Sequence, residues 1–398
     1  MSTFAGLWDD LRDVGRDART GGYHRFAWTP ADHTLREWFQ GAAESRGMTV
    51  VVDRAGNQWA WTEDPDAALA QGRTGVVLGS HLDSVPDGGA FDGPLGVVSA
   101  FAALDALRAD GFVPGRPLAI ANFADEEGAR FGIACAGSRI LTGALDADRA
   151  RALVDADGVT MAEAMAAAGH ESAHVGADPE MLARVGTYLE LHVEQGRGLD
   201  ELDRPVAVGS SIWPHGRWRL ELAGEANHAG TTRMVDRVDP MPRLAATILA
   251  ARDAATAAGC VATVGKIRVE PNGVNAIPSS VTAWLDARGP DADDVRRVVG
   301  EVAAASGADA VAESWTDSTV LAEDLAADLS RLLDDAPILA TGAGHDAGIL
   351  ARAGVRTAML FGRNPTGVSH SPAEHADPDD CLRGVEALAT VVRDQLQG

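Results

Sequence analysis

The chain has 398 residues, of which 46% are hydrophobic, and a formal net charge of −24. This length allows a sizeable core and two domains. The acidic balance argues against nucleic acid or an anionic membrane as a partner, because both bind basic surfaces. No stretch approaches the roughly 20 apolar residues of a membrane span. The acidic N-terminus lacks the apolar core of a signal peptide, so we expect a cytoplasmic protein.

The first half of the chain alternates between strand and helix patterns. We predict strands over 48–53, 59–62, 75–79, 117–123 and 185–192, and helices over 31–47, 95–109 and the Ala-rich 145–185. Such alternation is typical of an α/β domain with a mostly parallel sheet and helices on both faces.

From about residue 210 the predicted order becomes β-α-β-β-α-β. The strands are expected at 217–223, 261–269, 280–288 and 308–315, and the helices at 240–258 and 291–306. This is the order of a small ferredoxin-like α+β domain. A predicted helix at 321–335 and a strand at 356–361 then return the chain to the first domain. We therefore expect a catalytic domain of residues 1–209 and 323–398, with 210–322 inserted.

The three cysteines, Cys135, Cys260 and Cys381, are odd in number and far apart. They form no CxxC pair, so neither a disulfide framework nor a zinc site built from cysteine is indicated. We expect buried or inert thiols.

The segment GSHLDSVPDGGAFDG places His81, Asp83 and Asp92 around glycine-rich turns directly after a predicted strand. Turns of this kind can bring His81 and Asp92 to one point in space. An imidazole and a carboxylate that meet at a strand end are ligands that Zn²⁺ or Mn²⁺ accepts. The segment is therefore a candidate metal loop.

Further polar residues lie at the ends of other apolar strands. Glu126 and Glu127 follow 117–123, His192 ends 185–192, and His370 follows 356–361. Each alone has a structural explanation, such as carboxylates at a helix start. Together they favour a single metal centre, because sites in open α/β sheets form at the carboxyl ends of the strands.

Between about residues 79 and 372 the chain contains seven motifs in order: GSHLDSVPDGGAFDGPLGV, DEEGARFG, ELHVEQG, EANHAGTT, PNGVNAIPSSVTAWLDAR, GAGHDA and GVSHSP. This ordered set resembles the M20 metallo-amidohydrolases, in the branch of allantoate amidohydrolase, N-carbamoyl-L-amino-acid hydrolase and β-ureidopropionase. The resemblance is highly specific, because seven motifs occur in the expected order.

The resemblance implies two divalent metal ions in each subunit. Asp92 would bridge them at the ~3.5 Å separation usual for two-metal sites. His81 and His192 would complete the ligands of one ion, and Glu127 and His370 those of the other. This donor set is compatible with Zn²⁺ or Mn²⁺, and also with Co²⁺ or Ni²⁺.

The same resemblance implies the catalytic and substrate-binding residues. Asp83 would orient an imidazole, and Glu126 would be the general base that carries a proton from the attacking water to the leaving nitrogen. The inserted domain would form a homodimer and act as a lid, and its His228 would reach the partner's active site and stabilise the oxyanion. Asn275 would hydrogen-bond the substrate, and Arg288 would hold its carboxylate.

Several positions bear on the subclass. Relatives of the peptidase and aminoacylase type tend to carry a carboxylate at the position of His192, so a histidine there, with Gln195 following, fits the ureido or carbamoyl branch. The segment 212–218 and Arg233 depart from the family pattern near the expected substrate pocket. Within that segment His215 is a candidate for reading a polar acyl group. Outside it, Gln195 is a further candidate for binding the substrate.

We therefore expect a homodimeric binuclear-metal amidohydrolase that cleaves a linear C–N bond in a small carboxylate substrate. Allantoate and N-carbamoyl-L-amino acids are the leading substrates, and an N-formyl or other N-acyl amino acid is a third. The alternatives are a peptidase or deacylase of the same fold and a non-enzymatic metal-dependent binding protein. His192 argues against the first alternative, and the intact ligand set with Glu126 argues against the second.

Overall fold

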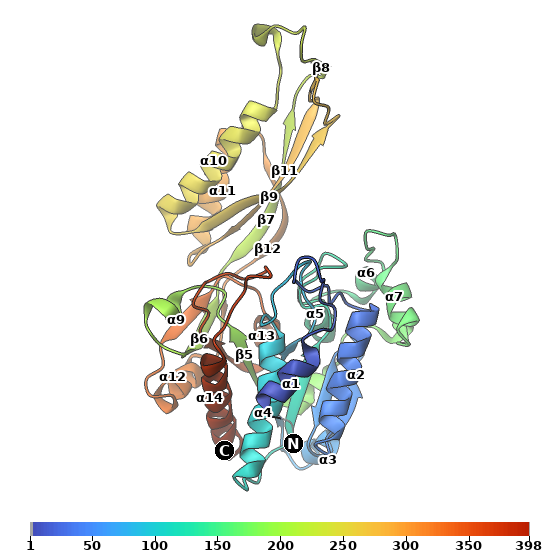
Figure 1. Ribbon diagram of the computed structural model, residues 1–398, viewed down its shortest axis with the longest axis vertical. Helices are drawn as coiled ribbons and strands as arrows, with labels where there is room; N and C mark the ends of the chain where they lie inside the picture. Colours follow the sequence, from blue (N-terminus) through green and yellow to red (C-terminus); the bar gives the residue numbers. More distant parts are fainter. Residues whose placement is uncertain (1–2, 398) are drawn as a thin grey trace. The chain divides into compact units, whose positions relative to one another are not determined.

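The computed structural model describes residues 3–397, and the chain divides into two compact units (Figure 1). The first unit comprises the chain up to Ser210 and from Val320 onward, and the second comprises Ser211–Thr319. Within residues 3–397, no helix is long and apolar enough to cross a membrane.

The first unit is built on a nine-stranded sheet of order β1-β2-β4-β3-β5-β15-β6-β13, with β14 paired to β6. The strands are β1 Thr49–Val52, β2 Gln58–Trp61, β3 Gly75–His81, β4 Leu118–Phe123, β5 Val185–Val193, β6 Val206–Ile212, β13 Thr319–Val320, β14 Ile338–Thr341 and β15 Arg356–Gly362. The middle strands β4, β3, β5 and β15 are parallel, whereas β2 and β6 join antiparallel. The predicted mainly parallel sheet is confirmed.

Helices cover both faces of this sheet, as predicted. One face packs against α1 Phe4–Leu11, α2 Pro30–Glu44, α4 Pro94–Ala109, α12 Glu323–Leu332 and α14 Pro378–Gln397. The other face packs against α5 Ala136–Thr142, α6 Ala147–Arg151, α7 Met161–Ala167, α8 Pro179–Arg184 and α13 Asp346–Arg352. Two further short helices are α3 Pro65–Leu69 and α9 Gly198–Glu201.

The predicted helix over 145–185 is wrong as a continuous element. The structure divides this stretch into α6, α7, a 3₁₀ turn at Ser172–His174 and α8. Gly158 and Gly169 lie between these pieces with φ of 82° and 85°. Glycine adopts this left-handed conformation readily, and an α-helix cannot continue through it.

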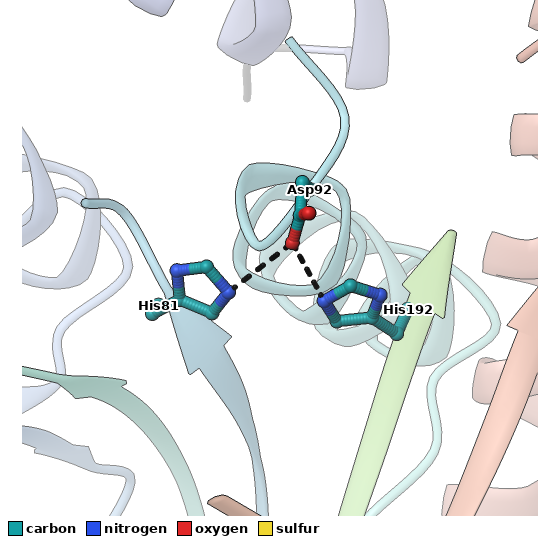
Figure 2. A group of neighbouring side chains, drawn as sticks. All are labelled: His81, Asp92 and His192. Atoms are coloured by element: carbon teal, nitrogen blue, oxygen red, sulfur yellow. Dashed lines mark ion pairs between the residues drawn. The ribbon is translucent and has the colours of Figure 1, made fainter. Parts of the chain in front are cut away.

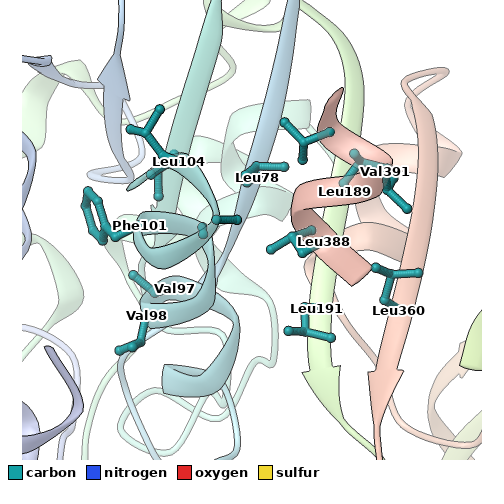
Figure 3. Packing of buried hydrophobic residues seen from close by; sticks show 14 of the residues in the cluster. Leu78, Val97, Val98, Phe101, Leu104, Leu189, Leu191, Leu360, Leu388 and Val391 are labelled. Carbon is teal, nitrogen blue, oxygen red and sulfur yellow. The ribbon is translucent and has the colours of Figure 1, made fainter. Parts of the chain in front are cut away.

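The core follows from the alternation of side chains along each strand. In β3, Val76 and Leu78 face α4 and α14, whereas Val77 faces the layer of α5 and α13. Figure 3 shows the first of these layers, with apolar side chains of β3, β5 and β15 against α4 and α14. Its labelled members are Leu78, Val97, Val98, Phe101, Leu104, Leu189, Leu191, Leu360, Leu388 and Val391.

A tight turn brings the start of α4 against the end of β3. Gly93 has φ of 85°, and a Cβ atom there would lie 2.4 Å from Cε1 of His81. Only glycine therefore allows the chain to pass this ring. Pro94 follows at the first helical position, where the missing N–H costs nothing.

The second unit has the predicted order β-α-β-β-α-β. Its main elements are β7 His215–Ala223, α10 Met241–Ala258, β9 Val261–Glu270, β11 Ser280–Arg288, α11 Ala292–Ser306 and β12 Ala310–Thr316. The four strands form an antiparallel sheet of order β12-β7-β11-β9, and α10 and α11 pack with it in one core. A small separate ladder pairs β8 Asn227–His228 with β10 Ala276–Ile277, and a 3₁₀ turn spans Met234–Asp236.

Phe101 offers a test of the packed layer between the sheet and α4. Its side chain is fully buried and meets Phe39 edge-to-face, with ring centroids 5.4 Å apart. Phe101→Ala should lower the free energy of unfolding by about 3–5 kcal/mol, because it removes buried surface and leaves a cavity. Denaturant unfolding followed by circular dichroism measures this, with Val113→Ala as a control at a position that is 82% exposed. A loss below about 1 kcal/mol for Phe101→Ala would contradict the packing described.

Candidate metal centre

The carboxyl ends of four neighbouring parallel strands, β4, β3, β5 and β15, lie at one edge of the central sheet. His81 is the last residue of β3, and His192 lies one residue before the end of β5. Glu126 and Glu127 follow β4, and the loop after β15 carries His370. The sheet therefore gathers polar groups from segments that are far apart in the sequence.

Asp92 lies between the two histidines of β3 and β5 (Figure 2). Its Oδ1 atom is 3.2 Å from Nε2 of His192 and 3.6 Å from Nε2 of His81. The three residues are 0% to 6% exposed. Charged groups this deeply buried require a compensating charge, from each other or from a bound cation.

The other oxygen of Asp92 faces a second cluster. Its Oδ2 atom is 3.3 Å from Nε2 of His370, and that nitrogen is 3.6 Å from Oε2 of Glu127. In each cluster, one potential ligand atom from each of the three residues lies within 4.8 Å of the others. Asp92 therefore presents one oxygen to each cluster, which is the arrangement of a carboxylate shared by two cations.

The two buried histidines are oriented for coordination through Nε2. Nδ1 of His192 lies 2.9 Å from the carbonyl oxygen of Val193, and Nδ1 of His81 lies 3.2 Å from that of Asp83. When Nδ1 donates to these oxygens, Nε2 carries the lone pair. Among the described residues neither Nε2 atom has a hydrogen-bond partner. Two unsatisfied imidazole nitrogens beside a carboxylate fit a divalent cation such as Zn²⁺.

The charges of the cluster shift its pKa values strongly. Burial raises the pKa of Asp92, but its contacts with His192, His370 and His81 outweigh burial and hold the pKa well below its ordinary value. Burial lowers the pKa of His81, but the charges of Glu126, Asp83 and Asp92 outweigh burial and raise it well above. The hydrogen bond to Asp92 raises the pKa of His370 to about 9. In the absence of a cation, protons on these histidines balance the carboxylates.

Glu126 is buried beside the first cluster, with Oε2 3.7 Å from Nε2 of His81. Burial raises its pKa well above the ordinary value, and the charges of Asp346 and Glu127 add to this while His81 opposes it. Such a carboxyl group can accept a proton near neutral pH and return it.

Asp83 holds the segment that carries the two glutamates. Its Oδ1 atom accepts a hydrogen bond from the backbone N–H of Glu126 (3.1 Å), and its Oδ2 atom accepts one from that of Glu127 (3.0 Å). Oδ1 also lies 3.3 Å from Nδ1 of His81. One carboxylate thus fixes the end of β3 relative to the loop after β4.

Gln195 lies at the same cluster. Its side-chain nitrogen donates to Oδ2 of Asp92 (2.8 Å) and to the hydroxyl of Ser369 (3.2 Å). The predicted substrate-binding Gln195 is therefore in direct contact with Asp92.

The structure adds residues that the sequence did not single out. The His345 ring packs on His192 with centroids 4.5 Å apart, and Glu190 completes a third group in which ligand atoms of His192 and His345 lie within 4.8 Å of one another. Glu190 is fully buried and accepts hydrogen bonds from Ser80 Oγ (2.9 Å) and the backbone of Ala347 (3.2 Å). A signal was present, because a glutamate two residues before His192 in an apolar strand must share its face of the sheet.

The other predicted site residues lie in the second unit, where they form two groups. His228 ends β8, and Asn275 directly precedes β10, so the β8–β10 ladder brings them together. His215 begins β7 and is in register with Arg288 at the end of β11. The Arg288 Nε donates to Oδ1 of Asp286 at 2.7 Å, and its guanidinium makes a second bond to Oδ2 at 3.1 Å.

The chain is similar to known proteins over most of its length. Residues 77–394 match the model of peptidase family M20/M25/M40. The chain is 34% identical to an N-carbamoyl-L-amino acid amidohydrolase of Geobacillus stearothermophilus, with 98% of each chain covered. It is 30% identical to an allantoate amidohydrolase of Escherichia coli, with 96% of this chain and 95% of that protein covered.

Solved structures are also similar to this chain over nearly its whole length. A crystal structure of AtUAH in complex with (S)-hydroxyglycine superimposes with a TM-score of 0.87 at 25% identity, covering 100% of this chain and 99% of that one. A hydantoinase/carbamoylase family amidase from Burkholderia vietnamiensis gives a TM-score of 0.86 at 27% identity, covering 99% and 97%. The chain belongs to the M20 family, and the resemblance predicted from its motifs is confirmed.

Metal binding should release protons at pH 7. Because the pKa of His370 is about 9 and that of His81 lies well above its ordinary value, both rings are protonated at this pH without metal. A ligand imidazole must be neutral, so the cation displaces these protons, and metal affinity should rise from pH 6 to pH 8. Calorimetric titration with Zn²⁺ in buffers of different ionisation enthalpy measures the release. His370→Ala should release fewer protons than the control His375→Ala, and a binding heat that is independent of buffer would contradict the expectation.

Proposed function

We propose that this protein is a homodimeric two-metal amidohydrolase that cleaves a linear C–N bond in an N-carbamoyl or ureido group of a small carboxylate substrate. The observation that carries the proposal is the position of the Asp92 carboxylate. Its Oδ1 atom faces His192 in the first cluster, and its Oδ2 atom faces His370 in the second. The full-length relatives named N-carbamoyl-L-amino acid amidohydrolase and allantoate amidohydrolase support the substrate class. Allantoate and N-carbamoyl-L-amino acids remain the leading substrates.

In this proposal the ligands fall into two sets joined by Asp92. His81 and His192 complete the set for one ion, and Glu127 and His370 complete the set for the other. Nitrogen and carboxylate donors of this kind suit Zn²⁺ or Mn²⁺, and Co²⁺ and Ni²⁺ also fit.

In this proposal the cations and the residues around them have different chemical roles. Two bound cations would polarise the scissile carbonyl and make water a nucleophile near neutral pH. Glu126 accepts the proton of the attacking water and delivers it to the leaving nitrogen, a role that its raised pKa supports. Asp83 holds the segment that carries Glu126 and Glu127, because its two oxygens accept hydrogen bonds from their backbone N–H groups.

The second unit supplies the remaining substrate contacts in this proposal. Arg288 binds the substrate carboxylate in a bidentate pair, and Asn275 hydrogen-bonds the substrate. Gln195 of the first unit and His215 contact the acyl or ureido group. His228 stabilises the oxyanion of the tetrahedral intermediate in the partner subunit.

The homodimer is supported by the surface of the second unit. β9 is an edge strand of its sheet, and Val261 and Ile267 on it are 53% and 49% exposed. On α10, Ile248 and Leu249 are 42% and 51% exposed. An unpaired strand edge beside exposed apolar side chains is a template for pairing with another chain. We therefore assign dimerisation to the second unit, and metal binding to the first.

The state of the three cysteines is evidence on the cellular compartment of the protein. All three are free and buried, as predicted. Free thiols are typical of a reducing compartment, which supports the proposed cytoplasmic location.

A substrate panel tests the proposed reaction. We expect the Zn²⁺- or Mn²⁺-loaded protein to cleave allantoate or an N-carbamoyl-L-amino acid faster than N-formyl amino acids and dipeptides. Glu126→Gln should lower kcat by about 10²–10⁴-fold while metal content stays unchanged, because only the proton carrier is lost. Turnover is measured by product release and metal content by elemental analysis. If no C–N substrate is cleaved, the enzymatic proposal is wrong; activity retained in Glu126→Gln would remove this residue from its role.

The proposed role of Arg288 in binding the substrate carboxylate is tested by measuring KM and kcat separately. Arg288→Ala should raise KM for the carboxylate substrate by about 10–100-fold, since a charge-assisted bond is worth about 1.5–3 kcal/mol, with a smaller effect on kcat. The matched control is the same substrate with its carboxylate converted to a carboxamide, for which wild type and variant should converge. An unchanged KM would displace Arg288 as the anchor.

The cross-subunit role of His228 is tested by breaking the dimer. Leu249→Asp should place a charge in the proposed interface and yield a monomer by analytical ultracentrifugation. The monomer should keep its metal but lose turnover, because no partner supplies His228. Val113→Asp, at an exposed apolar position of the first unit, serves as the control. A fully active monomer would refute the cross-subunit role.

A further inference from the structure

Glu374 is a buried carboxylate four residues after His370, and its side chain has no role in the ligand sets above. It is 6% exposed. Its Oε2 atom accepts hydrogen bonds from the backbone N–H groups of Phe91 (2.8 Å) and Asp92 (3.1 Å), and its Oε1 atom accepts one from the hydroxyl of Ser369 (3.2 Å). Glu374 therefore bonds the backbone of the shared ligand across a separation of 282 residues.

The chain around Asp92 is shaped to receive this carboxylate. A Cβ atom at Gly89 would lie 2.2 Å from Oε2 of Glu374 and 2.4 Å from its Cβ. Because any larger residue would clash there, Gly89 is what allows the loop to close on Glu374.

Ser369 extends the contact to the side chain of Asp92. Its hydroxyl lies 3.2 Å from Oδ2 of Asp92 as well as 3.2 Å from Oε1 of Glu374. It also accepts the side-chain N–H of Gln195 (3.2 Å). The hydroxyl thus links the carboxylates of Asp92 and Glu374 in one network.

The loop that carries His370 needs such a connection. The His370 side chain is 51% exposed, so little packing holds it. Its backbone has φ of 54°, a left-handed conformation that is uncommon outside glycine and persists only where neighbouring structure imposes it. By contrast, His81 and His192 lie in buried central strands of the sheet.

We propose that Glu374 is a positioning residue that clamps the Asp92 loop to the His370 loop, and so sets the affinity of the Asp92–Glu127–His370 ion position. This inference rests on the proposed two-metal function. The His81–Asp92–His192 position depends less on the clamp, because two of its three ligands are fixed by the sheet.

The test is a titration of metal-free protein with Zn²⁺ against a chromophoric chelator, which resolves two binding equivalents. Glu374→Ala should weaken one equivalent by about 10–100-fold, the usual effect of removing a residue that supports a ligand, and change the other by less than about threefold. Glu374→Gln should restore near wild-type binding, because its amide oxygen can accept from Phe91 and Asp92 while its N–H₂ group donates to Ser369.

Asp155→Ala is the matched control. The Asp155 carboxylate likewise accepts two backbone N–H groups, those of Asp157 and Val159, and one side-chain donor, Arg130. Its removal should lower the thermal unfolding midpoint without changing either Zn²⁺ equivalent.

The outcomes separate the clamp from the function on which it rests. Wild-type protein that binds two equivalents, together with a Glu374→Ala variant that binds both as tightly or weakens both equally, would overturn the clamp alone. Wild-type protein that binds fewer than two equivalents would contradict the two-metal function, and the clamp with it.

Discussion

The carboxylate of Asp92 lies between three imidazole rings, two from the buried strands β3 and β5 and one from the loop after β15. A buried carboxylate of this kind is unfavourable unless positive charge and hydrogen-bond donors compensate it. The fold meets this requirement by ending parallel strands at one edge of the sheet and by placing Gly93 where the loop must pass the His81 ring. The rest of the site is arranged around this one group.

A second layer of hydrogen bonds fixes the groups that face Asp92. Backbone carbonyls orient the two buried histidines, Asp83 holds the glutamates after β4, and Glu374 holds Asp92 itself. Because these supports come from the backbone or from buried carboxylates, the ligand geometry is set before a cation binds, which favours tight binding and precise positioning of the reacting groups. The most exposed of these ligand side chains is that of His370, which is 51% exposed.

Sequence patterns could predict the candidate ligands because each follows an apolar strand, and parallel strands place such residues together whatever their distance along the chain. The same reasoning could not find Glu374, since its contact with Asp92 depends on how two irregular loops fold, which no periodicity encodes. The alanine content of 145–185 favours a continuous helix, but the left-handed conformations of Gly158 and Gly169 interrupt it. Helix α14 is predictable in principle, because Cys381, Leu388 and other buried residues recur at helical spacing.

The most direct test is whether two metal ions share Asp92. Protein loaded with two equivalents of Mn²⁺ should give the electron paramagnetic resonance spectrum of an exchange-coupled pair, since ions bridged by one carboxylate lie about 3.5–4 Å apart. Asp92→Ala should abolish the coupled signal. A six-line spectrum of isolated Mn²⁺ in the fully loaded wild-type protein would contradict the shared site.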